Sequence, residues 1–90
     1  MANHKSAIKR DRQSKVRRMR NRMNKKRMKT AIRRVEEAIA TGSEEAARAQ
    51  LQKAVPIIQR TAVKGAIHKK TASRKVSRLT KKVNKMQAAA

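Results

Sequence analysis

The sequence predicts an all-α fold, a three-helix antiparallel bundle with a long N-terminal helix that extends as a basic arm. The 90 residues include only two glycines and one proline, so few positions interrupt helical backbone. Apolar residues recur every three or four positions, which is the spacing of a helix packed on one side. The two glycines divide this pattern into three segments, and three amphipathic stripes can close a small bundle.

The first predicted helix covers residues 6–41. Its C-terminal half carries an apolar stripe at helical spacing, formed by Met28, Ala31, Ile32, Val35, Ala38 and Ile39. Its N-terminal half has no comparable stripe, because its few apolar residues fall on the opposite side and its lysines and arginines point in almost every direction around the axis. We therefore expect residues 1–27 to form a basic arm that projects beyond a bundle of residues 28–86.

Two helix boundaries meet at Gly42. A glycine at this point suits a left-handed C-cap, and Ser43 can cap the following helix with its hydroxyl group. Two glutamates then lie in the first turn, at the positive end of the helix dipole. The second helix is predicted over residues 44–64. A kink and not a break is expected at Pro56, because the apolar pattern continues across it.

Gly65 marks the second boundary, and the third helix is predicted over residues 68–86. The stripe of the second helix comprises Ala47, Leu51, Ala54, Val55, Ile58 and Ala62. The stripe of the third helix, with the spacing of a bundle seam, comprises Ala72, Val76, Leu79, Val83 and Met86. Residues 87–90 are expected to fray as a tail, and the whole chain is expected to form one domain.

The charge of the chain points to a polyanionic partner. Lysine and arginine number 27 against 5 acidic residues, which gives a net charge of +22. Residues 1–34 carry +14 and residues 61–90 carry +9, whereas residues 35–60 carry −1. Valine, isoleucine and leucine together number only 14, so the core is thin and the chain alone lies near zero net stability. So many cations repel one another until a polyanion neutralises them.

The composition argues against several other functions. The chain has no cysteine and two histidines, and no carboxylate lies near His68 in the sequence, so neither a metal site nor a nucleophilic active site is expected. We expect no enzyme activity, no cofactor, no metal and no homo-oligomer. No apolar run reaches the roughly 18 residues of a membrane span, and no secretory signal is evident, so the cytoplasm is the expected compartment. A membrane-surface role needs Trp, Phe or Leu opposite a cationic face, and the arm lacks that arrangement.

Nucleic acid is the partner that the cations favour, because arginine and lysine pair with phosphate oxygens and release counterions. The chain has no Phe, Tyr or Trp for base stacking, which favours folded RNA or a duplex over an unstructured strand. The cations of the arm are Lys5, Lys9, Arg10, Arg12, Lys15, Arg17, Arg18, Arg20, Arg22, Lys25, Lys26, Arg27 and Lys29. All of these except Arg20 and Arg27 are assigned as RNA-binding residues. A second cationic face, opposite the apolar stripe of the third helix, comprises Lys70, Arg74, Lys75, Arg78, Lys81, Lys82 and Lys85. The first four of these are assigned as RNA-binding residues. Charge alone also permits a DNA-compacting protein, which comparison of affinities for duplex DNA and folded RNA at equal salt would distinguish.

Two separated motifs resemble a known family. The first runs from Met1 to Arg10 as MANHKSAIKR and continues through Gln13-Ser14, Asn21 and Lys29-Thr30; the second is Lys64-Gly65-Ala66-Ile67-His68-Lys69, followed by Ala72, Arg74 and Ser77-Arg78-Leu79. In order and spacing, nearly the whole chain is similar to the bacterial small-subunit ribosomal protein S-twenty family. The chain has Lys70 where the family usually has asparagine, and a cation there still suits a phosphate.

The resemblance implies a three-helix bundle with a long first helix, bound directly to small-subunit ribosomal RNA. It implies contacts with the 5′ domain and with the penultimate helix of that RNA, a role in assembly and cohesion of the subunit, and at most peripheral contacts with other small-subunit proteins. By position in the two motifs, it adds Ser6, Gln13, Ser14, Lys64, His68, Lys69 and Ser77 to the expected RNA-binding residues. From the residues alone, His68 is expected either to help start the third helix or to donate to a phosphate or base.

Overall fold

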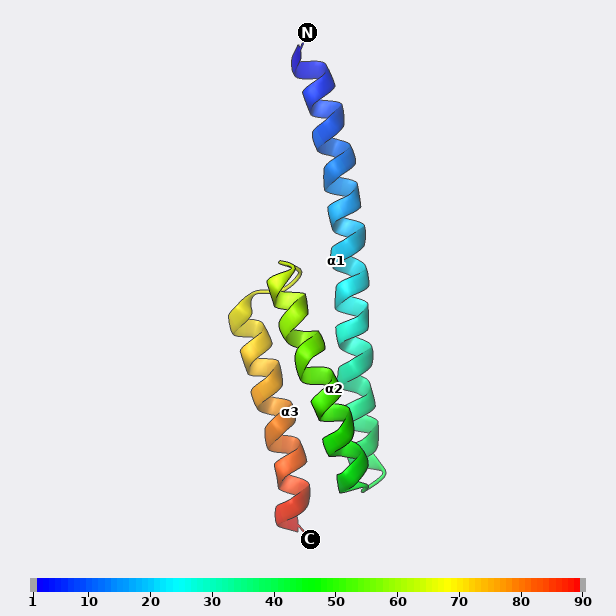
Figure 1. The fold of residues 1–90 in the computed structure, drawn as a ribbon, viewed down its shortest axis with the longest axis vertical. Coiled ribbons are helices and arrows are strands. Elements are labelled where there is room, and N and C mark those ends of the chain that lie inside the picture. Colours follow the sequence, from blue (N-terminus) through cyan, green and yellow to red (C-terminus); the bar gives the residue numbers. More distant parts are fainter. Residues whose placement is uncertain (1, 90) are drawn as a thin grey trace.

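The computed structural model describes the backbone of residues 2–89 and the side chains of residues 5–86. Three helices follow one another, α1 (Ala2–Ala40), α2 (Glu44–Val63) and α3 (Lys69–Ala89). Figure 1 shows α2 running antiparallel to both α1 and α3, with the first half of α1 extending past the other two helices. Within the described range there is no β-strand, and the predicted all-α bundle with a long first helix is confirmed.

The helix ends differ slightly from the predicted ones. α1 begins at Ala2, ahead of residue 6, and α3 continues to Ala89, so it includes most of the tail that was expected to fray. Alanine has the highest helix propensity, which favours this extension at the C-terminus. Residue 90 lies outside the described part of the chain. α2 runs without a break through Pro56, in agreement with the continuous apolar pattern across that residue.

The first junction has the capping geometry that its sequence predicts. Gly42 adopts a φ of +79°, a left-handed conformation that costs glycine little, and its N–H donates to the Ile39 carbonyl at 3.0 Å. Ser43 has extended backbone, and its hydroxyl oxygen accepts the Ala46 N–H at 3.3 Å. The glycine turn and the serine cap therefore supply hydrogen bonds to backbone groups at the end of α1 and the start of α2 that have no partner within their own helix.

The second junction is a Schellman motif. Gly65 has a φ of +81°, its N–H donates to the Ala62 carbonyl at 3.0 Å, and the Ala66 N–H donates to the Thr61 carbonyl at 3.1 Å. This pair of bonds closes the C-terminus of α2 and fixes the backbone of Lys64, the C-cap residue. The turn between α2 and α3 is thus held by its own hydrogen bonds.

The core lies where the three helices run side by side, and it is built around alanines. Its most buried side chains are Met28, Ala31, Val35, Ala38, Ala47, Ala54, Ile58, Ala72, Leu79 and Val83. In α1 the predicted stripe is correct, but Ile32 and Ile39 are only half-buried while the two alanines are buried. Small residues permit close approach of the helix backbones, so they occupy the centre of the contact and the larger side chains flank it.

α2 packs against both other helices, whereas α1 and α3 contact each other little. The one ion pair that joins α1 to α3 among the described side chains links Lys82 Nζ to Glu36 Oε1 at 3.2 Å. Burial in α1 begins at Met28, and the molecule measures 69 × 21 × 14 Å as a consequence of the long first helix. The α2–α3 turn ends beside the middle of α1 (Figure 1), so the first half of α1 has no helix packed against it.

Candidate nucleic-acid interface

The cations of the arm are exposed on every side of α1. From Lys5 to Arg27, each described side chain is exposed except those of Ser14, Asn21 and Asn24, which are half-buried. At about 100° per residue, neighbouring cations along the arm point in different directions. Only the side toward the α2–α3 turn is partly covered, so anionic groups can approach the segment from several sides.

One face of α1 changes character along its length. Eighteen residues correspond to five turns of a helix, so Arg17 lies on the same face as Val35, and Gln13 lies on the same face as Ala31. The core-facing stripe, continued five turns toward the N-terminus, reads Arg10, Gln13, Ser14, Arg17, Arg20 and Asn21. The face that buries apolar side chains in the bundle therefore presents polar and cationic side chains beyond it.

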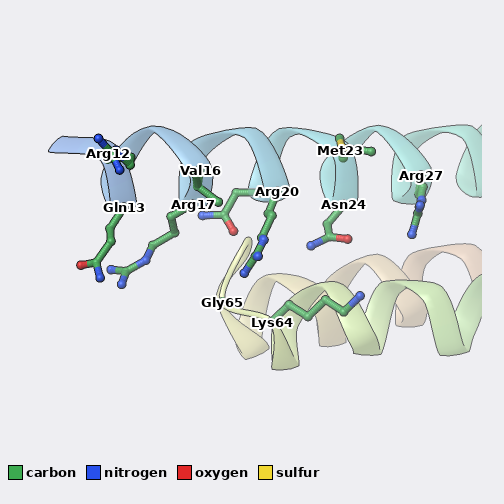
Figure 2. A pocket seen from close by; sticks show the side chains of 11 residues that line it. Arg12, Gln13, Val16, Arg17, Arg20, Met23, Asn24, Arg27, Lys64 and Gly65 are labelled. Atoms are coloured by element: carbon green, nitrogen blue, oxygen red, sulfur yellow. The ribbon is translucent and has the colours of Figure 1, made fainter. Parts of the chain in front are cut away.

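This polar face lines a cleft of about 990 Å³ between α1 and the α2–α3 turn. Figure 2 shows Gln13, Arg17 and Arg20 pointing from α1 toward the side on which Lys64 and Gly65 lie. The complete lining comprises Arg12, Gln13, Val16, Arg17, Arg20, Asn21, Met23, Asn24, Arg27, Lys64 and Gly65. Five of these residues are cations and none is acidic, so the cleft is electropositive.

The cleft brings together residues that are far apart in the sequence. Of the predicted RNA-binding residues, Arg12, Gln13, Arg17 and Lys64 line it. The remaining predicted residues of the arm lie on α1 outside the cleft: Lys5, Ser6, Lys9, Arg10, Ser14, Lys15, Arg18, Arg22, Lys25, Lys26 and Lys29. All of these are exposed except Ser14, which is half-buried.

Arg20 and Arg27, cations of the arm that were not assigned as RNA-binding residues, line the cleft together with Asn21 and Asn24. Two signals in the sequence could have placed Arg20 in this cleft. The five-turn relation places Arg20 in phase with a buried residue of the bundle. The lengths of α1 and α2 also place Lys64 opposite residue 20, because α2 returns antiparallel from a turn at residues 41–43.

α3 carries a second cationic surface. Lys70, Arg74 and Arg78 are exposed, and Lys75 is half-buried. Lys70, Arg74 and Arg78 lie away from Leu79 and Val83, which are buried in the core. Lys75 lies one helical turn before Leu79, so it borders the packed face of α3 and does not lie opposite it as predicted. The other cations of the predicted face, Lys81, Lys82 and Lys85, are also exposed. Two other predicted residues, Lys69 and Ser77, line a smaller cleft of about 670 Å³ between α2 and α3.

His68 caps the start of α3. Its Nδ1 accepts the backbone N–H of Lys70 at 3.1 Å, and its carbonyl accepts the N–H of Ala72 at 3.1 Å. This is the arrangement of an N-cap residue. A ring nitrogen that accepts a hydrogen bond carries no proton, so the proton of the neutral ring is on Nε2. The exposed ring can therefore offer Nε2–H as a donor to a phosphate or base acceptor.

Only one acidic residue lies within the arm. Asp11 Oδ2 is 3.2 Å from Lys15 Nζ, and both side chains are more than 60% exposed, at 66% and 73%. Exposed pairs of this type contribute about 0.3–0.5 kcal/mol. A phosphate can replace this partner at little cost, so the pair does not remove Lys15 from the interface.

The described residues contain no group of three or more His, Cys, Asp or Glu side chains that could hold a metal ion. Between residues 2 and 89, none of the helices has an apolar stretch long enough to cross a membrane.

Comparison with known proteins identifies the family. The family model described as ribosomal protein S20 matches residues 2–84. The chain belongs to the ribosomal protein S20 family. The family predicted from the two motifs is thus confirmed, and a member of this family is a structural ribosomal component and not an enzyme.

Relatives of this S20 protein match it over nearly their whole length. The small ribosomal subunit protein bS20 of Syntrophobacter fumaroxidans is 61% identical over 84 residues, which cover 93% of this chain and 98% of the relative. The bS20 protein of Trichlorobacter lovleyi is 58% identical over 84 residues, which cover 93% of this chain and 97% of the relative. That of Desulfotalea psychrophila is 53% identical over 89 residues, which cover 99% of this chain and all of the relative.

Proposed function

We propose that this protein binds small-subunit ribosomal RNA directly and holds two segments of that RNA together during assembly. As a member of the S20 family it is a structural constituent of the small ribosomal subunit, in the ribosome and so in the cytoplasm. The proposal assigns residues 1–27 to RNA contact as a basic arm and residues 28–86 to the three-helix bundle that carries it. The last four residues, 87–90, which were expected to fray as a tail, are assigned no role.

The observation that carries the proposal is the exposure of cations all around α1 before Met28. Such a segment gains little helical stability from its own protein, because like charges on every side weaken an isolated helix. Phosphate groups on several sides would neutralise these charges and release counterions. An arm with cations on one face suits a flat surface, whereas this arm suits insertion between RNA segments.

The second RNA segment is assigned to α3. Lys70, Arg74 and Arg78 form a cationic surface on a different helix from the arm. Because α1 and α3 contact each other little, the two surfaces can face different parts of the RNA. The resemblance of the sequence motifs to the family implies the 5′ domain and the penultimate helix as these two parts. Contacts with other small-subunit proteins are proposed to be peripheral, and no homo-oligomer is proposed.

A bridging assay tests this function. A biotinylated 5′-domain transcript is immobilised, a labelled transcript of the penultimate helix is added, and its retention is measured with and without the protein. Retention that depends on the protein is expected. Chemical footprinting of both transcripts in the same mixture is expected to show protection in each of them.

Two control variants separate the surfaces. Replacing Lys70, Arg74 and Arg78 by glutamine is expected to abolish retention of the second transcript while binding to one transcript persists. Equal charge removal at Arg33, Arg48 and Lys53, outside both surfaces, is expected to leave retention unchanged. Affinity for duplex DNA equal to that for the folded RNA at the same salt would instead support a general nucleic-acid-compacting role.

A further inference from the structure

We propose that the cleft between α1 and the α2–α3 turn holds one single-stranded segment of the folded RNA, gripped by the arm on one side and by Lys64 on the other. This inference rests on the proposed function and states which form of RNA, a single strand, binds at this part of the surface. The family motif gave Lys64 as a residue expected to bind RNA. The inference adds that the α2–α3 turn, which carries Lys64, forms the second wall of the RNA site.

The charge of the cleft requires an anion. Arg12, Arg17, Arg20, Arg27 and Lys64 line it, and none of them takes part in a salt bridge among the described side chains. Cations gathered around one cleft without a carboxylate repel each other. A chain of phosphates that passes between the two walls would relieve this repulsion from both sides.

The size of the cleft favours one strand. A volume of about 990 Å³ corresponds to a cube with edges of about 10 Å. A whole RNA double helix, with two ribose-phosphate chains and the paired bases between them, is too large to be enclosed by this cleft. A single ribose-phosphate chain fits, with its bases directed along or out of the cleft.

The uncharged residues of the cleft suit nucleotides more than phosphate alone. Gln13, Asn21 and Asn24 line it, and each amide group offers both donors and an acceptor, which is what unpaired base edges and 2′-hydroxyl groups require. Val16 and Met23 supply apolar contact area beside them. Since the chain has no aromatic residue, these contacts involve edges and riboses and not stacking on a ring.

The second wall is formed in advance. The hydrogen bonds of Gly65 and Ala66 to the end of α2, at 3.0 and 3.1 Å, fix the turn, and they hold the backbone of Lys64 in helical conformation. A preformed wall lowers the ordering cost of binding. The turn therefore offers a fixed surface against which an RNA strand can lie opposite the arm.

Directed cleavage tests the shared strand. The chain contains no cysteine, so a hydroxyl-radical probe can be tethered at one position through Gln13→Cys, at a second through Lys64→Cys, and at a control position on α2 through Lys53→Cys. In complexes with the 5′-domain transcript, probes at 13 and 64 are expected to cut overlapping nucleotides of one unpaired strand. The probe at 53 is expected to cut elsewhere or not at all.

Cuts from positions 13 and 64 in separate RNA segments would overturn the inference while leaving direct RNA binding intact. A failure of the unsubstituted protein to bind the transcript would instead contradict the proposed function. If Lys64→Cys weakens binding, Ala66→Cys provides a second probe position on the same turn.

A binding measurement adds an independent criterion. A folded RNA hairpin with an unpaired loop is compared with a fully paired RNA duplex, for the unsubstituted protein and for Arg17→Gln/Lys64→Gln. Loss of two phosphate contacts with a single strand is expected to lower the slope of log affinity against log salt by about 1.4. The slope for the duplex, and the slope measured with the control Arg33→Gln/Lys53→Gln, are expected to change less. Displacement of the RNA by polyglutamate of equal charge at equal concentration would show an unspecific anion site and would overturn the assignment.

Discussion

Replacing Arg17, Arg20 and Arg27 by glutamine should produce a measurable change in the salt dependence of RNA binding. All three line the cleft and none has a carboxylate partner among the described ion pairs. Glutamine and arginine have similar helix propensities, so the arm should keep its conformation. The substitution therefore removes phosphate contacts with little other change.

The magnitude follows from counterion release. Each contact with a single strand adds about 0.7 to the slope of log affinity against log salt, so loss of three contacts lowers the slope by about 2.1. Between 50 and 200 mM salt, the unsubstituted protein should then lose about 20-fold more affinity than the variant does. Contacts with a duplex, at about 0.9 each, would raise this ratio to about 40-fold.

Fluorescence anisotropy with a labelled 5′-domain transcript over this salt range measures the slope. The matched control replaces Arg33, Arg48 and Lys53, which lowers the net charge equally outside the arm. An unchanged slope for the arm variant, or an equal change for the control, would mean that these guanidinium groups do not contact phosphate.

Four further outcomes are expected. Ile58→Ala, at a fully buried core position, should lower the free energy of unfolding by about 2–5 kcal/mol, measured by urea unfolding in sulfate buffer. Gly65→Ala meets no atom within 4 Å but requires positive φ, and should cost about 1–2 kcal/mol in the same assay; no cost would contradict the left-handed turn. His68→Ala should cost about 0.5–2 kcal/mol through loss of the cap, whereas His68→Asn should retain most of it. Circular dichroism should show helicity rising when RNA is added, and full helicity without RNA would refute the idea that the arm lacks partners in its own chain.

The three helices and their ends at the two glycines were predictable because local chemistry determines them, whereas the outer ends of α1 and α3 extend beyond the predicted ones. Gly42 and Gly65 adopt the left-handed conformations that a glycine after a helix indicates, and the hydroxyl of Ser43 caps α2 as its position suggests. The bundle stripes were predictable for the same reason, since their spacing follows the helical period.

The centre of the core and the cleft were harder to predict, because both depend on how close the helices lie and where they end. Hydrophobicity ranks Ile32 above Ala31, yet the alanine is the more buried of the two. Arg20 looked like one cation among many, and only the length of α2 places it opposite Lys64. The contacts of the exposed arm residues stay predictions, because their partners are not part of this chain.

The continuity of α1 ties the orientation of its far end to its near end. No glycine or proline falls between residues 2 and 40. A rotation of α1 where it packs in the bundle, from Met28 onward, therefore rotates the N-terminal end of the helix by the same angle. Inserting one residue near position 25 would turn every preceding side chain by about 100° and shift it by about 1.5 Å, which would swing Arg17 off the cleft. An insertion of eighteen residues would restore the phase but displace the tip by about 27 Å. RNA binding by the arm should therefore tolerate substitutions in α1 between the bundle and the N-terminal end far better than insertions or deletions there.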